Sequence, residues 1–361
     1  MTNYTLIIPL KLKTWERPGN FTDFWEVVAK YLRRLNYWKR NFHRLGKMNW
    51  FLLPLLLSLY GCGTFQKWAM RSTNPVFVKT SHDLLQEGHW EFFRDSSPGN
   101  LKLMELLWQQ DHENLELLGV LIKGFSGYAF AIPETLYLED EIKGIEESRW
   151  KKEAIVFYTR SLDYGLYYLH KKGIKREDLL SNNENKLKEK LKGLGEDDYM
   201  ALLYTAQSWG SLINLQKDNV ALVSQVPKVK ILFDFVCNKK PDIDQNVCDI
   251  FYAQYESSRP KMLGGNPEKG EKLYLEAIKK HPRNLLIRVS YIQYRLIPGF
   301  KEEEFQREAV LLSEEFSKWE NLNRDALENR SSYKDIPELN LYNSIAQKRF
   351  QIMNKLKNKI F

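Results

Sequence analysis

The chain has 361 residues, with 54 Lys and Arg against 46 Asp and Glu, and a formal net charge of +8. The charge is uneven, because residues 1–61 hold ten Lys/Arg and three Asp/Glu, whereas the remainder holds 44 basic and 43 acidic residues. A nucleic-acid-binding surface needs a basic excess within the folded domain. The composition therefore excludes nucleic acid as a partner.

The first distinctive element is an apolar run of ten residues, from Phe51 to Tyr60, which ends in Gly61 and Cys62. It is too short to span a bilayer, which takes about 20 apolar residues, and it matches the roughly 7–15 residues of a signal-peptide core. Leu59 and Gly61 stand where a lipobox has an aliphatic and a small residue. We therefore expect residues 48–62 to be a lipoprotein signal peptide, with Cys62 lipidated. The alternative is a buried helix with a chance cysteine.

Residues 1–47 precede this signal and are basic and aromatic without a clear core. A start codon assigned too far upstream would make them an extension that is not translated in vivo, and a genuine basic amphipathic arm is the alternative. The signal itself predicts a lipid-anchored protein on the periplasmic side of a bacterial membrane, inner or outer. Residues 63–98 are predicted to be a linker and a first helical segment.

From residue 99 to residue 361 the pattern is helical almost throughout. Segments such as LKLMELLWQQ and EKLYLEAIKKH place apolar residues at steps of three and four, which is typical of amphipathic helices. No stretch alternates with period two long enough to predict a strand. Asn266-Pro267 is predicted to be an N-cap followed by proline at the first helical position. Residues 175–198 are highly charged and predicted to be an exposed helical excursion. The predicted class is all-α.

A finer periodicity predicts how the helices are arranged. One spacing of four, three and five residues occurs three times: in Gly270, Tyr274, Ala277 and Pro282; in Val229, Phe233, Val236 and Pro241; and in Asn100, Met104, Leu107 and His112. This is the pattern of the second helix of a tetratricopeptide repeat (TPR), in which a small residue lets two helices approach and a proline ends the helix. We expect residues 99–361 to form a right-handed solenoid of TPR-like helical hairpins.

The residue types that usually mark catalysis or metal binding are sparse. Cys237 and Cys248 flank a turn between two predicted helices, so they either pair in an oxidising envelope or are two small buried hydrophobes. His82 and His89 lie near acidic residues at spacings that fit no metal site. No Ser-His-Asp constellation and no phosphate-binding loop stand out. We expect no enzyme activity, no metal and no cofactor.

Several motifs resemble one family. The segment LLYTAQSWGSLINLQKDN, the segment YESSRPKMLGG and the element FYTRSLDYGLYYL are similar to the T component of TRAP transporters, the TatT family of periplasmic lipoproteins. The resemblance extends from about residue 100 to the C-terminus and is interrupted by residues 175–198 and by residues 318–337. Its most specific pieces are Tyr204 with Trp209-Gly210, and the run 255–260 with Gly264-Gly265. Arg160, Asp163, Tyr164 and Gly165 match an Arg-x-x-Asp-Tyr-Gly element of the family. Ser258 stands where the family often has glycine.

The resemblance implies a lipid-anchored accessory protein that docks the periplasmic solute-binding protein of a TRAP system and holds a hydrophobic ligand in a groove. The competing function is a generic TPR scaffold in envelope assembly, without a small-molecule ligand. Self-association stays open. The two functions share the anchor and the repeats, so only the family motifs separate them.

The candidate site for a ligand or a partner consists of two residue pairs together with Glu256. Tyr204 and Trp209 lie five apart on one predicted helix, and Tyr255 and Arg259 lie four apart on another, so each pair roughly shares a face. The aromatic rings are expected to hold an apolar group, while Arg259 binds a carboxylate. The alternatives are a core position for Trp209 and an ion pair of Arg259 with Glu256. A further ion pair is predicted between Arg160 and Asp163.

Overall fold

The structure is a computed structural model, and it describes residues 84–181, 183–329 and 337–361. All the described residues belong to one compact unit, residues 65–361. The predictions for residues 1–47, for the signal peptide at 48–62 and for Cys62 lie outside the described residues. The same holds for the first part of the predicted linker.

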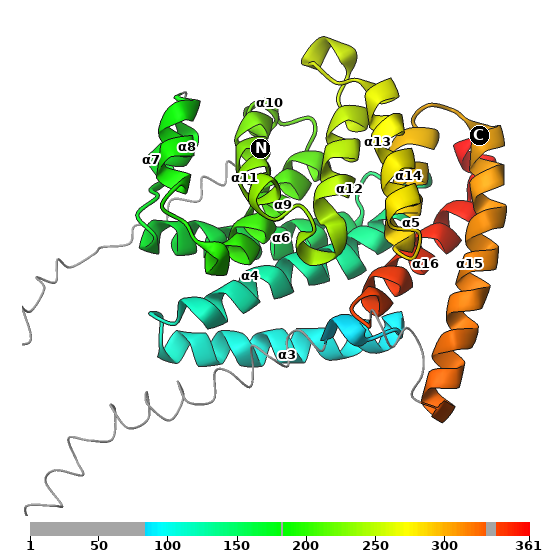
Figure 1. The fold of residues 1–361 in the computed structure, drawn as a ribbon, viewed down its shortest axis with the longest axis horizontal. Coiled ribbons are helices and arrows are strands. Elements are labelled where there is room, and N and C mark those ends of the chain that lie inside the picture. Colours follow the sequence, from blue (N-terminus) through cyan, green and yellow to red (C-terminus); the bar gives the residue numbers. More distant parts are fainter. Residues whose placement is uncertain (1–83, 182, 330–336) are drawn as a thin grey trace, which may run out of the picture. The chain divides into compact units, whose positions relative to one another are not determined.

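The described part of the chain is helical and contains no strand (Figure 1), so the predicted all-α class is confirmed. The helices are α3 (Trp90–Gln110), α4 (Leu115–Ala129), α5 (Thr135–Ile142), α6 (Arg149–Lys171), α7 (Arg176–Leu180), α8 (Glu184–Leu191), α9 (Tyr199–Leu215), α10 (Val220–Val223), α11 (Val226–Lys239), α12 (Ile243–Ser258), α13 (Pro267–Lys280), α14 (Leu285–Tyr291), α15 (Glu302–Asn329), α16 (Leu339–Lys355) and α17 (Lys357–Ile360). Short 3₁₀ turns at Leu84–Gln86, Glu196–Asp198 and Lys261–Leu263 and π-helical turns at Phe130–Glu134 and Ile292–Leu296 complete the order.

Local sequence signals explain where several helices begin. The Asn266 side chain accepts a hydrogen bond from the Lys269 amide at 2.9 Å, and Pro267 follows at the first helical position, as predicted. The predicted boundary between residues 98 and 99 falls inside α3, which contains Pro98. In the charged excursion, Leu187 and Leu191 are fully buried, because α8 packs against α11.

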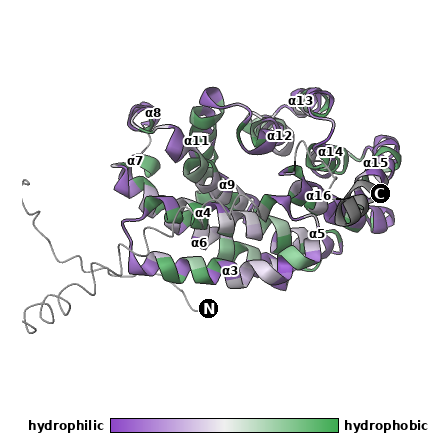
Figure 2. Cartoon of the chain, turned by 60° about the horizontal axis from the view of Figure 1, so that its bottom comes forward, coloured by the Kyte–Doolittle hydropathy of each residue, from purple (hydrophilic) through white to green (hydrophobic). Residues whose placement is uncertain are grey.

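The core lies mainly between helices that are close in sequence, and the distant helix α16 completes it. The helix α4 packs against α3, α6 and α9, and α12 packs against α13. The helix α16, near the C-terminus, packs against α14, α5 and α3. It thus brings the C-terminal part of the chain against the first helices (Figure 1). Figure 2 shows polar residues along the outer sides of helices such as α8 and α13.

The TPR pattern is partly visible in the packing. Gly270 is buried, and a Cβ placed there would lie 2.1 Å from Ser257 Oγ on α12, so the small residue does allow two helices to approach. Asn100, in contrast, is exposed and separates no helices. The TPR-like solenoid therefore stays a prediction within a confirmed all-α fold.

One continuous apolar stretch, Leu115–Ile142, is long and apolar enough to cross a membrane by length and composition alone. It comprises α4, a π-helical turn and α5, and 56% of its most apolar window is buried inside the domain. Leu118, Leu121 and Ile122 are fully buried. The apolar composition of this stretch is that of a core helix.

Candidate functional site

A cavity of about 560 Å³, partly open to solvent, lies among the helices of the domain. Its wall is mainly apolar, with Phe93, Val120, Val229, Phe251, Leu286 and Ile345 contributed by α3, α4, α11, α12, α14 and α16 respectively. Glycines leave part of this space open. A Cβ placed at Gly127 would meet no atom within 4 Å, although Gly127 lines the cavity. The sequence thus keeps volume free where side chains would otherwise fill the core.

A buried charged cluster forms one part of the cavity wall. Asp244, whose side chain is 3% exposed, accepts a hydrogen bond from Lys123 Nζ at 2.9 Å. It also accepts hydrogen bonds from the hydroxyls of Tyr204 and Tyr342, the latter at 2.6 Å. Burial alone would raise the pKa of the Asp244 carboxyl, but Lys123 and the two hydroxyls outweigh it and hold the pKa below its ordinary value.

The backbone that carries Asp244 is in a rare conformation. Asp244, Gln245 and Asn246 have φ of 49°, 59° and 67°, so three consecutive residues other than glycine are left-handed. Such residues are uncommon and cost free energy, although Asp and Asn tolerate the conformation best. The buried ion pair and a hydrogen bond from Asn284 Nδ2 to Gln245 O, at 2.8 Å, hold this turn. Strained backbone of this kind is concentrated at functional sites.

A second buried network connects the middle of the chain with its end. Arg349, which is 1% exposed, donates from Nη2 to Glu134 Oε1 at 2.7 Å and from Nε to Thr135 Oγ1 at 3.0 Å. The Tyr158 hydroxyl donates to Glu134 Oε2 at 2.5 Å. Glu134 lines the cavity, but its negative charge is already neutralised by Arg349.

The structure does not bring Tyr204 and Trp209 into one site. Tyr204 lines the cavity and belongs to the Asp244 cluster. Trp209 is 4% exposed, and its Nε1 donates to Gln225 Oε1 at 2.8 Å. Trp209 is not among the cavity-lining residues, so its position is that of the interhelical core.

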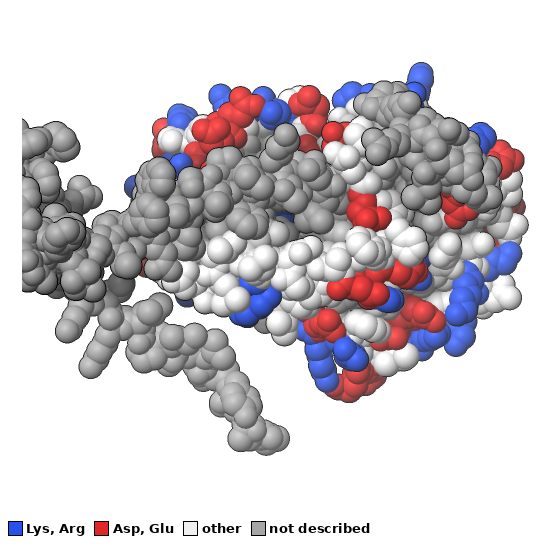
Figure 3. All heavy atoms as spheres, turned by 90° about the horizontal axis from the view of Figure 1, so that it is seen from below, with Lys and Arg blue, Asp and Glu red and all other residues white. Residues whose placement is uncertain are grey.

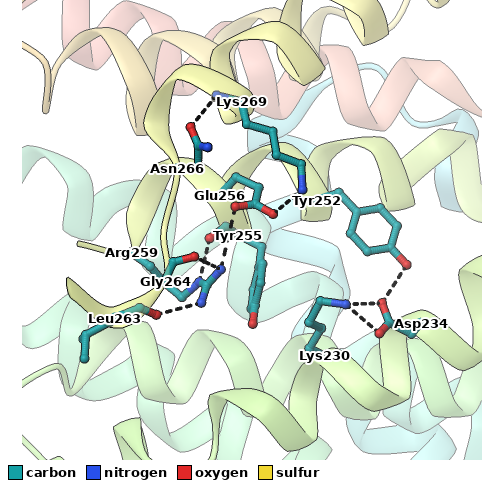
Figure 4. Close-up of polar contacts among 10 residues, drawn as sticks. All are labelled: Lys230, Asp234, Tyr252, Tyr255, Glu256, Arg259, Leu263, Gly264, Asn266 and Lys269. Carbon is teal, nitrogen blue, oxygen red and sulfur yellow. Dashed lines mark hydrogen bonds and ion pairs between the residues drawn. The ribbon is translucent and has the colours of Figure 1, made fainter. Parts of the chain in front are cut away.

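Tyr255 and Arg259 both line the cavity, yet Arg259 is occupied by its own loop (Figure 4). Its guanidinium stacks 3.6 Å above the Tyr255 ring. It donates to three backbone carbonyls, those of Tyr255, Leu263 and Gly264, at 2.9–3.0 Å. Arg259 lies 3.8 Å from Glu256, which pairs more closely with Lys269, at 2.8 Å. Arg259 thus stabilises the loop and does not present a free cation.

Two further predictions meet different outcomes. The structure places Arg160 against Glu105 and not against Asp163: Arg160 Nε lies 3.4 Å from Glu105 Oε1 on α3. Asp163 has a pKa raised by burial, an effect that Arg176 opposes. Cys237 and Cys248 are joined by a disulfide, with 5.8 Å between their Cα atoms.

Sequence reasoning missed Lys123, Asp244, Tyr342 and the Glu134–Arg349 pair. The one available signal was Lys123, the single charge in the apolar segment VLIKGFSGYAF, since an isolated charge on an apolar helix must find a partner. Its partner Asp244 lies 121 residues away. Among the described residues, no group of three or more His, Cys, Asp or Glu is placed to hold a metal ion.

Comparison with known proteins agrees with the motifs. The sequence profile of a family described as TRAP transporter T-component matches residues 86–361, which is more than half of the chain and includes every described residue of the cavity wall except Leu85. Comparison with curated proteins gives no match. The match over this length shows that the chain belongs to the TRAP transporter T-component family.

Proposed function

We propose that this chain is the lipid-anchored, periplasmic accessory component of a TRAP-type transport system, that it docks the solute-binding protein, and that its cavity binds a small apolar ligand. Membership of the family supports the accessory role. The apolar run that ends at Cys62 supports the anchor and the periplasmic location.

The cavity is the observation that carries ligand binding. A volume of about 560 Å³ lies within the range of about 300–1,000 Å³ that small-molecule sites occupy. A mostly apolar wall with a few fixed polar groups is also how such sites are built. A purely structural scaffold gains nothing from this space, because unfilled core volume lowers the free energy of unfolding. The cavity therefore favours a ligand-binding component over a scaffold without a ligand.

Protein docking needs a surface as well as a cavity. Figure 3 shows one face, and its described part carries Lys and Arg beside Asp and Glu, so charges of both signs are interspersed there. This surface suits a protein partner with mixed charges better than a polyanion. No described residue is assigned to the docking of the solute-binding protein.

The test is to fill the cavity without disturbing the fold. Gly127→Phe places a ring in the open space beside a helix, while Gly99→Phe, at an exposed position of α3 where a Cβ also meets nothing within 4 Å, is the matched control. Full-length protein isolated from cell envelopes should yield a bound apolar compound on solvent extraction and mass spectrometry. Gly127→Phe should lose this compound, whereas Gly99→Phe should retain it.

Docking is tested separately, by crosslinking the full-length chain to the solute-binding protein of the same transport system. Capture by both the wild type and Gly127→Phe would support docking that does not depend on the ligand. If the wild type carries no compound and captures no binding protein, the proposed function is wrong.

A further inference from the structure

One wall of the cavity is a polar stripe along α9. Tyr204, Gln207, Ser211 and Asn214 all line the cavity, and their spacing of three and four residues places them on one face of the helix. Lys217 also lines the cavity and follows the end of α9 at Leu215. At 1.5 Å per residue, Gln207 and Asn214 lie about 10 Å apart along this wall. The stripe is unusual, because most of the other residues of α9 are apolar and buried.

The stripe contains two side-chain amides, those of Gln207 and Asn214. No described residue forms a hydrogen bond with the side chain of Gln207 or Asn214, and the same holds for Gln254, a cavity-lining residue of α12. An amide group offers two donors and one acceptor oxygen. The three side chains are half-buried, so a ligand that displaces water from them without forming hydrogen bonds would leave these groups unpaired at a cost in free energy. These amides are therefore available to form hydrogen bonds with a ligand bound in the cavity.

The charged groups around the cavity, in contrast, are already neutralised. Lys123 is paired with Asp244, and Glu134 is paired with Arg349. Arg259 is occupied by three carbonyls. Lys217 alone among the cavity-lining cations has no described ion-pair partner, and it is exposed beyond the end of α9. A charged head group that did not reach Lys217 would lose its hydration without gaining an opposite charge.

We infer that the cavity selects an uncharged amphiphile, with an apolar chain against the aliphatic and aromatic walls and hydroxyl or amide groups bound by Gln207 and Asn214. This inference rests on the proposed function that the cavity binds a small ligand. It differs from the expectation that Arg259 binds a carboxylate, because Arg259 already bonds three loop carbonyls. Selection arises because a site built to form hydrogen bonds discriminates against ligands that leave its polar groups unpaired.

The test compares two ligands that share one chain and differ in the head group. Full-length protein in phospholipid nanodiscs is loaded with an uncharged naphthylamine fluorophore, with empty nanodiscs as the blank. Monododecanoylglycerol, which is uncharged and carries two hydroxyls, and dodecanoate, which is anionic, then compete for the site. We expect the glycerol ester to displace the fluorophore at a concentration about tenfold lower than dodecanoate.

Two leucine variants show whether the stripe is responsible. Gln207→Leu and Asn214→Leu should each weaken binding of the glycerol ester by roughly fivefold to tenfold, the worth of one or two hydrogen bonds, and leave fluorophore binding unchanged. Gln216→Leu is the control, since the Gln216 amide bonds Leu212 O on α9 and does not line the cavity.

Three results would overturn the inference. Equal displacement by the two ligands, with the fluorophore bound, would refute head-group selection and leave the proposed ligand site standing. Tighter binding of dodecanoate that is lost in Lys217→Met would place an anionic head group at the exposed end of the stripe. No binding of the fluorophore or of either ligand would refute this inference together with ligand binding in the proposed function.

Discussion

Replacing Asp244 by asparagine tests the buried cluster of the cavity wall. Asparagine has nearly the same shape and tolerates a left-handed backbone, so the substitution removes a charge and leaves the turn in place. The cost follows from Lys123, whose side chain is only 17% exposed and whose ammonium lies 2.9 Å from the Asp244 carboxylate. After the change this ammonium stays inside the domain without an opposite charge.

The magnitude can be worked from this geometry. Breaking a buried ion pair by removing one partner costs about 3–5 kcal/mol, and two unit charges 4 Å apart attract by about 4 kcal/mol at an effective dielectric constant near 20. Because Lys123 retains some contact with solvent, we expect the lower end, a loss of about 3 kcal/mol from the free energy of unfolding at pH 7. Glu184→Gln is the matched control. Its pair with Lys188 spans 3.6 Å with both side chains about half exposed, so it should cost under about 0.5 kcal/mol.

Urea unfolding as a function of pH is the assay. The pKa of Asp244 is lowered in the folded state, so its contribution is complete above the unfolded pKa, near 3.9, and is lost as the pH falls through the folded pKa. The difference in the free energy of unfolding between wild type and Asp244→Asn should be constant from pH 7 to pH 5 and should narrow only below about pH 4. A gap under about 1 kcal/mol at pH 7 would mean that the cluster is solvated like a surface pair. A gap that does not narrow in acid would refute the assignment to this carboxyl.

Two further variants test the loop and the disulfide. Arg259→Ala removes the donors to three loop carbonyls and should lower the free energy of unfolding by about 2 kcal/mol. The affinity for the uncharged glycerol ester should change less than twofold. Unchanged stability with a large loss of affinity would show that Arg259 binds the ligand. Reduction of the Cys237–Cys248 bond, which joins residues 11 apart, should lower stability by about 2–4 kcal/mol, measured by urea unfolding with and without dithiothreitol. The double variant Cys237→Ser/Cys248→Ser should be as unstable as the reduced wild type and insensitive to the reductant. Equal stability of the reduced and oxidised wild type would contradict a stabilising role of the disulfide.

Local features could be predicted because they depend on a few neighbouring residues. The cap at Asn266 and the close approach at Gly270 follow from the side chain at one position and the chain beside it. Helical periodicity shows which face of a helix is buried, but it does not show which distant helix covers that face. For this reason the meeting of Lys123 with Asp244, and of Glu134 with Arg349, could not be predicted.

Arg259 illustrates a different limit. Its residue type is suited both to binding a carboxylate and to bonding backbone carbonyls. The loop geometry decides between the two, and it depends on Gly265, where a Cβ would lie 1.9 Å from Arg259 O. The sequence shows the pair Gly264-Gly265, yet the direction in which the loop turns back on the arginine is a property of the folded backbone.

The contacts of α16 with the first helices bear on how the protein is made. Asn340 donates to Gln86 O and Arg349 bonds Glu134, partners that precede them by 254 and 215 residues. In a linear repeat array, each newly synthesised repeat can fold on the one before it. Here the early segments lack one of their packing partners until α16 is also present. A chain terminated before residue 339 would keep Glu134 without its arginine, and quality-control proteases would act on such a fragment. The packing of the early segments thus depends on a chain that is complete as far as α16.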